Sequence, residues 1–319
     1  MAGTGRRVHA AGAVLALAAM ALSACGNDLA ALKLTMASGV EKGVYNRLSA
    51  ALADAWTEQL GIEHPQVAAT KGSVDNLQRL RAGLADVGFS QADAAERAAV
   101  DEPGKRKLYA LARMHDDYLQ VVVRDDLVVT RLVDLKGLRV SIGSETSGVR
   151  LIADRLLASA GISPDTDLRV QHLDLNEASE AMLAGSLDAF IWSGGLPTQQ
   201  VTQLAQSVKV KMLDLSDVLP ELRRQFPVYG SATLPASAYS QPDKPGKAVT
   251  TLVVRNFLLV NDLMSDEAAE ALVGGLFKAQ PRLEAASPAA RSIEIRAAIE
   301  TTPLPLHPGA LRYYRGSKV

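Results

Sequence analysis

The sequence predicts an α/β protein made of two similar lobes joined by a hinge. Its 319 residues are enough for about two domains of ordinary size. Short apolar segments alternate with amphipathic ones, the pattern of a parallel sheet with crossover helices. A similar stretch also occurs once in each half, at 81–90 and 183–193: Ala-Gly, an aspartate three residues after the glycine, a buried strand and a serine-containing loop.

In the first half, two short strands are expected at 34–37 and 67–70. The helix between them is predicted over 45–60, because its apolar residues recur at helical spacing and Gly61 suits a left-handed C-terminal position. The next helix is predicted to begin at Ser73, a favourable N-cap residue, and to bury a stripe of leucines.

The second half repeats this order. Two strands are expected there, at 138–142 and 168–172. A polar loop follows the first of them, and a helix then begins at Val149 and stops at Gly161. Asn176 is predicted to cap a further helix that ends at Gly185. Strand, glycine-bearing loop and helix therefore recur in both halves.

Two strand-like connections between the lobes are expected, at 118–123 and 251–254, and they form the hinge. The chain then returns to the first lobe, with a helical, alanine-rich segment over 265–299. Three prolines and a basic end make 301–319 a loosely packed tail in this prediction. The predicted boundaries are 34–118 plus 252–319 for lobe I and 119–251 for lobe II.

Residues 1–24 are predicted to be an export signal peptide. After a short basic start, the apolar run at 10–21 is too short to span a ~30 Å hydrocarbon core permanently. The Leu-Ser-Ala-Cys segment that follows resembles a bacterial lipobox, so Cys25 is predicted to be lipidated; a chance cysteine in an ordinary signal peptide is the alternative. Residues 25–33 then form a lipidated tether, and the mature protein lies outside the cytoplasm, anchored to the cell membrane.

Composition argues against several classes of partner. The formal net charge of −1 gives no long-range attraction to nucleic acid, and 4% aromatic residues argue against base-stacking platforms. A single cysteine cannot form an internal disulfide and, with five scattered histidines, argues against a cysteine-based zinc site. We therefore expect no metal, no cofactor and no nucleic-acid partner.

The sequence shows no motif typical of a catalytic site. The zinc-peptidase, serine-hydrolase, phosphate-loop and Cys-x-x-Cys patterns are all absent. The acid pairs Asp116-Asp117 and Asp125-Asp126 are interpreted as solvated loop ends, because adjacent residues share no face of a helix or strand. Asp93 is the least firmly excluded candidate for a base. The sequence thus favours a binding protein over an enzyme.

Small polar loops follow the predicted strands, at 38–45, 70–76, 90–93, 144–150 and 192–198. Several of them precede helices, whose N-termini offer unpaired N–H groups and a partial positive charge that suit a carboxylate. Arg150 adds a possible bidentate contact. Each loop alone is explained by turn chemistry and helix capping, and Tyr45 and Trp192 alone by packing. Together, at the edge where open parallel sheets bind ligands, they indicate a shared cleft.

These loops carry motifs in the order found in the TAXI family, the extracytoplasmic solute receptors of TRAP transporters. After the lipobox, the motifs are Gly39-x3-Gly43-Val44-Tyr45, Thr70-x-Gly72-Ser73-x2-Asn76, Gln91-x-Asp93, Ser147-Gly148-Val149-Arg150 and Trp192-Ser193-Gly194-Gly195-x-Pro197. The segment 134–140 also resembles the one that opens the second lobe of these proteins. The likeness covers about residues 34–280.

The resemblance implies a two-lobed periplasmic-binding-protein type II (Venus-flytrap) fold with a hinge. It also implies a small carboxylated ligand, either a glutamate-like amino acid or an organic acid, and delivery to TRAP membrane subunits driven by an ion gradient. The ligand-binding residues that it implies are Gly39, Tyr45, Ser73, Asn76, Gln91, Ser147, Val149 (through its backbone N–H), Arg150, Ser193 and Gly194.

The sequence departs from that family at two positions of the implied site. Asn46 stands where many relatives have a second aromatic residue, and Val149 replaces a threonine hydroxyl. The site is therefore expected to be less polar, and the ligand need not be glutamate. Arg150 has an alternative orientation, in which it points away from the cleft and pairs with an acid.

The predicted function is that of a lipid-anchored receptor, without a catalytic step, that closes on a small carboxylate and delivers it to a TRAP-type transporter. A sensory or scaffold lipoprotein that uses the same fold without transport is the main alternative. An enzyme is a further alternative, because one fold can serve several functions.

Overall fold

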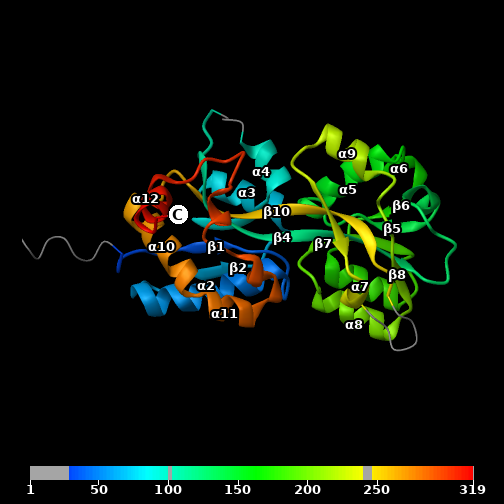
Figure 1. The fold of residues 1–319 in the computed structure, drawn as a ribbon, viewed down its shortest axis with the longest axis horizontal. Coiled ribbons are helices and arrows are strands. Elements are labelled where there is room, and N and C mark those ends of the chain that lie inside the picture. The colour runs from blue at the N-terminus through cyan, green and yellow to red at the C-terminus, as the bar shows by residue number, and fades with distance from the viewer. Residues whose placement is uncertain (1–28, 100–102, 240–245, 319) are drawn as a thin grey trace, which may run out of the picture.

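The computed structural model describes residues 29–99, 103–239 and 246–318. The predicted signal peptide and Cys25 lie outside these residues. Two lobes lie side by side along the longest axis of the molecule and are joined by two long strands (Figure 1). We call them lobe I, which contains the strand Thr35–Ala37, and lobe II, which contains the strand Arg139–Ser141.

The described strands form a single sheet. They are β1 (Thr35–Ala37), β2 (Gln66–Ala68), β3 (Val87–Gln91), β4 (Leu108–Arg124), β5 (Arg139–Ser141), β6 (Arg169–Gln171), β7 (Ala189–Gly194), β8 (Val210–Met212), β9 (Gly230–Leu234) and β10 (Val249–Asn261). Their order is β2-β1-β3-β10-β4-β7-β5-β6, with β8 paired to β4 and β9 to β10. The predicted short strands of both halves are confirmed.

The two lobes have the same strand order. Lobe I has β2-β1-β3-β10 and lobe II has β6-β5-β7-β4; in each, the first three strands are parallel and the fourth is antiparallel. The long strands β4 and β10 also pair with each other. Each therefore completes the sheet of one lobe and continues into the other, which confirms the two predicted strand-like connections.

Helices cover both faces of this sheet (Figure 1). They are α2 (Val44–Leu60), α3 (Ser73–Ala82), α4 (Ala92–Ala98), α5 (Gly148–Ser159), α6 (Pro164–Asp167), α7 (Leu175–Leu183), α8 (Gln199–Ser207), α9 (Leu219–Gln225), α10 (Asp266–Lys278), α11 (Gln280–Ala286) and α12 (Pro308–Gly316). Helix α2 buries Trp56 completely, and its indole N–H donates to Leu272 O of α10 at 3.1 Å.

Two predicted N-caps are wrong by one or two residues. Ser73 is the first residue of α3 and Gly72 is its N-cap. The Ser73 hydroxyl instead accepts a hydrogen bond from Gln91 N at 3.1 Å, so it links α3 to the end of β3. Asn176 lies inside α7, whose N-cap is Asp174; the Asp174 carboxylate accepts from the backbone N–H groups of Asn176 and Glu177.

The stretch that occurs in both halves has the same structure in both lobes. The Asp86 carboxylate accepts from Thr35 N at 2.8 Å, and Thr35 O accepts from Asp86 N at 2.9 Å. Asp188 makes the same pair of bonds with Arg139, at 2.9 and 3.0 Å. In each lobe the aspartate therefore fixes the start of the first strand beside the third. The sequence likeness reflects a structural repeat.

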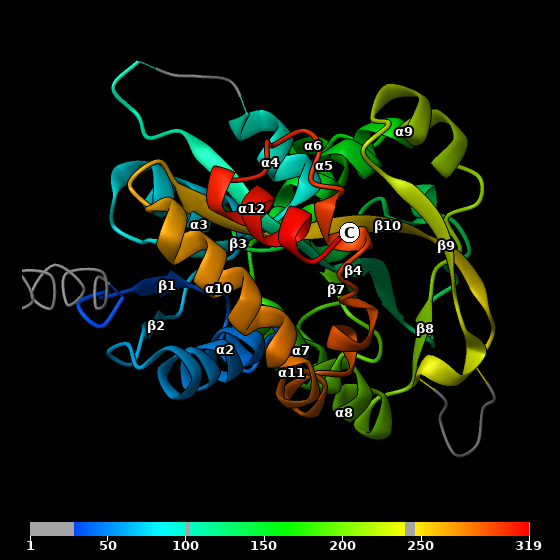
Figure 2. The same cartoon turned by 60° about the vertical axis from the view of Figure 1, so that its left-hand side comes forward.

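The prediction of a loosely packed C-terminal tail is wrong. The segment contains α12, which lies against α10 (Figure 2). Tyr314 is 3% exposed, and its hydroxyl donates to Leu111 O at 2.9 Å. The misleading signal was proline, but Pro308 occupies the first turn of the helix, where a missing N–H removes no helical hydrogen bond.

We expect Asp188→Asn to lower the free energy of unfolding by about 1.5–3 kcal/mol at pH 7, because the carboxylate binds the Arg139 guanidinium as well as its backbone. The hydrogen bond from Arg139 lowers the pKa of Asp188. The stabilisation is therefore present above the unfolded pKa of about 4 and is lost as pH falls through the lower folded pKa. Urea unfolding at pH 7 and pH 3 measures it.

Asp126→Asn is the matched control, because Asp126 forms an ion pair with Arg124 at the surface, with 62% of its side chain exposed. We expect this control to leave the free energy of unfolding nearly unchanged, because water screens an exposed ion pair. Equal effects of the two substitutions would contradict the proposed importance of the repeated aspartate.

Candidate functional site

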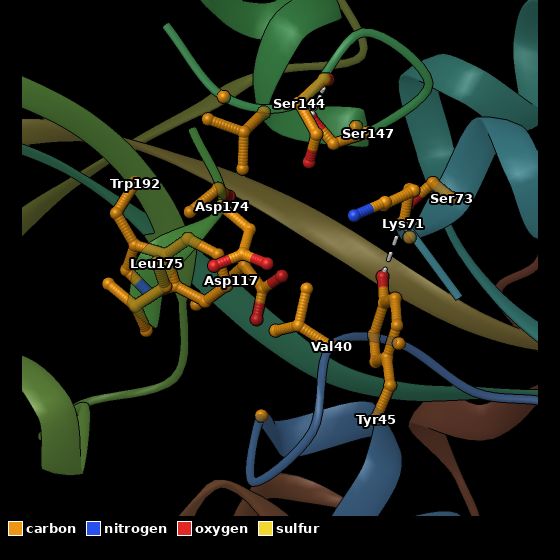
Figure 3. Close-up of a pocket in the computed structure, with 18 of the residues that line it drawn as sticks. Val40, Tyr45, Lys71, Ser73, Asp117, Ser144, Ser147, Asp174, Leu175 and Trp192 are labelled. Carbon is orange, nitrogen blue, oxygen red and sulfur yellow. Dashed lines mark hydrogen bonds between the residues drawn. The ribbon is translucent and has the colours of Figure 1, made fainter. Parts of the chain in front are cut away.

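A cavity lies between the two lobes, where the polar loops meet (Figure 3). Its empty volume is about 680 Å³, including the part open to solvent. Lobe I contributes the N-terminal regions of α2 and α3 and the end of β3. Lobe II contributes the α5 N-terminus, the loop before α7 and the end of β7, and β4 crosses the site.

The structure brings eight of the ten predicted site residues to this cavity. They are Gly39, Tyr45, Ser73, Gln91, Ser147, Val149, Ser193 and Gly194. Gly39 allows close approach of the Tyr45 ring, since a Cβ there would lie 3.2 Å from Tyr45 Cβ. The ligand-binding roles of these residues remain predictions, but the five loops do converge on one place.

Gln91 connects the two lobes across the cavity. Its side-chain amide N–H donates to Asp117 Oδ2 at 3.0 Å and to the Ser193 hydroxyl at 2.8 Å. Gln91 belongs to lobe I, Ser193 to lobe II and Asp117 to the crossing strand β4. All three side chains are almost completely buried. The amide therefore links the two lobes and the crossing strand β4 by hydrogen bonds.

Tyr45 forms part of the cavity wall in lobe I. Its ring stacks on Phe89 with centroids 5.0 Å apart, and its hydroxyl lies 3.5 Å from the Ser73 hydroxyl and donates to the Asn256 side chain. Burial, and then the nearby Asp117 charge, raise the pKa of Tyr45 well above its ordinary value. The phenol therefore stays neutral and offers a hydroxyl, not a charge, to the cavity.

The N-terminus of α5 points into the cavity from lobe II. Ser147 is its N-cap: its hydroxyl accepts from Arg150 N at 3.1 Å and donates to Ser144 O at 2.7 Å. Gly148 and Val149 form the first turn and line the cavity. A helix N-terminus carries roughly half a positive charge, so this wall favours a negatively charged group.

Asn76 and Arg150 do not line the cavity. Asn76 is completely buried, and its amide donates to Ser38 O at 2.6 Å and to Phe89 O at 2.8 Å, so it joins strand ends within lobe I. Arg150 bonds Asp154 at 2.9 Å and contacts His172. The alternative orientation of Arg150, pairing with an acid, is the one that the structure shows.

Three charged residues of the cavity lining were not predicted as site residues: Lys71, Asp117 and Asp174. The interpretation of Asp117 as a solvated loop end is wrong, since Asp117 lies within β4 and is 3% exposed. The signal that was missed is the length of the strand: β4 continues through the polar His115-Asp116-Asp117 stretch because it crosses the cleft. Lys71 precedes α3, and Asp174 caps α7.

Contacts between the lobes on both sides of the cavity show that the structure is closed. Asp75 N donates to Thr146 O at 3.1 Å. Arg47 of α2 donates to Gln199 of α8. Between α4 and the segment before β9, the Tyr229 hydroxyl donates to Asp93 Oδ2 at 2.7 Å. Asp93 is completely buried in this interlobe contact and does not line the cavity, so it is not positioned to act as a base there.

Burial raises the pKa of Asp93 to about 6, against the opposing effects of Tyr229 and Arg155. Because the folded-state pKa is raised, the contribution of Asp93 to the free energy of unfolding is fully present below the ordinary pKa of about 4. This contribution is lost as pH rises through about 6. We therefore expect Asp93→Asn, which removes the charge and keeps an acceptor for Tyr229, to raise the free energy of unfolding at pH 8 by up to about 3 kcal/mol. The gain should disappear towards pH 4 in urea unfolding.

Tyr229→Phe is the companion variant. It removes the hydroxyl that donates to the buried carboxylate and should therefore destabilise the protein at pH 8, by about 1–3 kcal/mol. If the Asp93→Asn variant were less stable than the unsubstituted protein at pH 8, the result would contradict the assignment of a costly buried charge to Asp93.

Neither a metal centre nor a membrane span is found in the part of the chain that the structure describes. No group of three or more His, Cys, Asp or Glu residues there is arranged to hold a metal ion. No described helix is both long and apolar enough to cross a bilayer.

Solved structures resemble this chain over most of its length. A protein from Bordetella bronchiseptica RB50 is 17% identical, with a TM-score of 0.55 over 91% of this chain and 90% of that one. The alkanesulfonate-binding protein SsuA from Xanthomonas axonopodis pv. citri, bound to MOPS, is 17% identical, with a TM-score of 0.50 over 89% and 83%. A protein described as an L-cystine ABC transporter from Listeria monocytogenes is 13% identical, with a TM-score of 0.50 over 81% and 95%.

The strand order that the two lobes have in common, the interlobe cavity and the similarity to solved structures define the class. This is the two-lobed fold of periplasmic solute-binding proteins, as the sequence predicted. A family model described as the NMT1-like family matches residues 36–317. The chain therefore belongs to the NMT1-like family. Membership of the TAXI family in particular stays a prediction.

Proposed function

We propose that this protein is an extracytoplasmic receptor that binds a small carboxylated solute between its lobes and delivers it to a TRAP-type membrane transporter. The observation that carries the proposal is the closed cavity at the N-termini of α3 and α5. Ser73, Ser144 and Ser147 line it as neutral hydrogen-bonding groups. No catalytic step is needed, because closure alone would bury the solute.

Two features of the cavity favour a carboxylate. The α5 N-terminus presents its partial positive charge to the interior. Lys71, at the start of α3, directs its amino group into the same space (Figure 3). The two positive groups come from opposite lobes, so a bound anion would stabilise the closed arrangement over an open one.

Binding is tested by calorimetry with a panel of monocarboxylates, dicarboxylates, 2-oxoacids and amino acids. We expect at least one class to bind, and Lys71→Met to weaken that binding by about tenfold or more, since a charge-assisted hydrogen bond contributes about 1.5–3 kcal/mol. Lys136→Met is the control, because Lys136 pairs with Asp167 at the surface. No binding by any carboxylate would refute the proposal.

The choice of a TRAP transporter rests on the order of the motifs shared with the TAXI family, and it makes an energetic prediction. Uptake of the solute by intact cells should stop when an ionophore collapses the ion gradients. It should persist when ATP is depleted and the gradients are kept. The opposite result would assign the receptor to an ATP-driven system. Binding without any uptake would support the sensory alternative.

The lipid anchor is a separate part of the proposal. Cys25→Ser should release the mature protein from the membrane fraction into the soluble one, and mass spectrometry of the unsubstituted protein should find acyl chains on Cys25. Membrane association that survives the substitution would contradict the anchor.

A further inference from the structure

The charged side chains of the cavity are not the set that a simple anion would need. Asp117 and Asp174 direct their carboxylates into the cavity, and among the described residues Lys71 is the one basic side chain that lines it (Figure 3). With neutral imidazoles, the lining carries a formal charge of −1. A dicarboxylate would add two negative charges to this enclosed space, where water screens them poorly. A positively charged group on the solute would compensate the negative charge of the lining.

Asp117 is the carboxylate with a buried oxygen that receives no hydrogen bond. Its Oδ2 accepts from Gln91, but its Oδ1 has no hydrogen bond from any described residue. His115 Nε2 lies 3.2 Å from Oδ1 as an ion-pair contact, without hydrogen-bonding geometry. Asp174 differs, because its carboxylate already caps α7. A buried carboxylate oxygen that receives no hydrogen bond is costly, so Oδ1 is a place for a further donor beside His115.

A second buried acceptor on the cavity wall is also without a partner. Gln91 Oε1 receives no hydrogen bond from the described residues. The orientation of this amide follows from its neighbours, since Asp117 Oδ2 can only accept and must face the amide N–H. Oε1 therefore points the other way, beside Gly148. Asp117 and Gln91, which are bonded to each other, thus offer two free acceptors to one occupant.

We propose that the solute carries a protonated amine that binds Asp117 and Gln91, so that it is an amino-acid-like zwitterion and not a plain organic acid. An ammonium group has three donors and a positive charge, which match the two acceptors and the charge of the lining. The carboxylate of the same molecule then lies towards the α5 N-terminus and Lys71. This inference rests on the proposed function and narrows its ligand class.

The rest of the lining indicates the carbon skeleton of this zwitterion. The apolar side chains that line the cavity include Val40, Val44, Leu173, Leu175, Phe190 and Trp192. Burial of apolar ligand surface against apolar walls is favourable, whereas a polar side chain would find no hydrogen-bond partner on them. Leucine and phenylalanine are therefore the first probes.

The test compares three matched probes by calorimetry: leucine, 4-methylpentanoate, which lacks the amine, and 3-methylbutylamine, which lacks the carboxylate. Phenylalanine, 3-phenylpropanoate and 2-phenylethylamine form a second set. We expect the amino acid of at least one set to bind at least about tenfold more tightly than both analogues. Asp117→Asn should reduce that preference for the amine by about tenfold or more, and should not weaken binding of the amine-free acid.

Asp116→Asn is the control, because Asp116 is the neighbouring residue on β4 and pairs with Arg113 outside the cavity. Melting curves verify that both variants fold. Amine-free acids that bind as tightly as amino acids, or an unchanged preference in Asp117→Asn, would overturn the inference while leaving the proposed function intact. Binding of the amines alone would keep the ammonium site and refute the carboxylate. Binding of none of the six probes counts against the inference, and the wider carboxylate panel then decides the proposed function.

Discussion

Gly148→Ala should remove most of the affinity for solute, because a methyl group there opposes the contact between the lobes that the structure shows. A Cβ at this position would lie 2.1 Å from Gln91 Oε1 and 2.8 Å from the Ser73 hydroxyl, both on the opposite lobe. Gln91 is held by Asp117 and Ser193, so it cannot withdraw without breaking two buried hydrogen bonds. At about 1–1.5 kcal/mol each, these bonds predict a loss of affinity of roughly 30- to 150-fold.

The position of this glycine makes the effect specific to closure. The methyl group clashes only where the lobes meet, and separating the lobes removes the clash. Calorimetry should therefore show weaker binding, and the ligand-induced rise in melting temperature should shrink. Affinity unchanged in Gly148→Ala would mean that the bound state does not have this interlobe contact.

The largest loss of stability is expected from Gly309→Ala. A Cβ there would lie 2.0 Å from Asp266 O and 2.8 Å from Asp266 C, which are backbone atoms at the start of α10. Unlike a flexible side chain, this backbone cannot move aside without separating α12 from α10. We therefore expect a decrease of about 3 kcal/mol or more in the free energy of unfolding, at the upper end of overpacking effects.

Gly316→Ala in the same helix is the control, because a Cβ there meets nothing within 4 Å. Urea unfolding measures both variants, and proteolysis of the native protein shows whether α12 has detached. A loss below about 1 kcal/mol in Gly309→Ala would contradict the tight docking of the C-terminal helix.

Local patterns were sufficient to predict the repeated unit of this fold. Short apolar strands, glycine-bearing loops and amphipathic helices are properties of neighbouring residues, and Asp86 and Asp188 stand at the same place of the repeated sequence in both halves. The loops of the cavity followed from the topology, because parallel strands end at a common edge. Helix caps were less certain, since Gly72 and Asp174 compete with the equally suitable Ser73 and Asn176.

The missed features depend on contacts between distant segments. Asp117 resembles a solvated acid locally, and it is buried because β4 crosses from one lobe to the other. Arg150 has a partner within its own helix, Asp154 one turn away, and this ion pair rather than the cavity fixes the guanidinium. The C-terminal helix is stabilised by Tyr314 against β4, two hundred residues earlier in the chain. None of these can be read from a local window.

The two tryptophans of the chain lie in contrasting surroundings. Trp56 is completely enclosed in lobe I and bonded to Leu272, while Trp192 lines the cavity. Indole emission responds to the polarity of its surroundings, so the arrival of a solute should change the fluorescence of Trp192 and leave that of Trp56 constant. The molecule thus contains both an optical reporter of occupancy and its internal reference, which lets ligands be screened without any label.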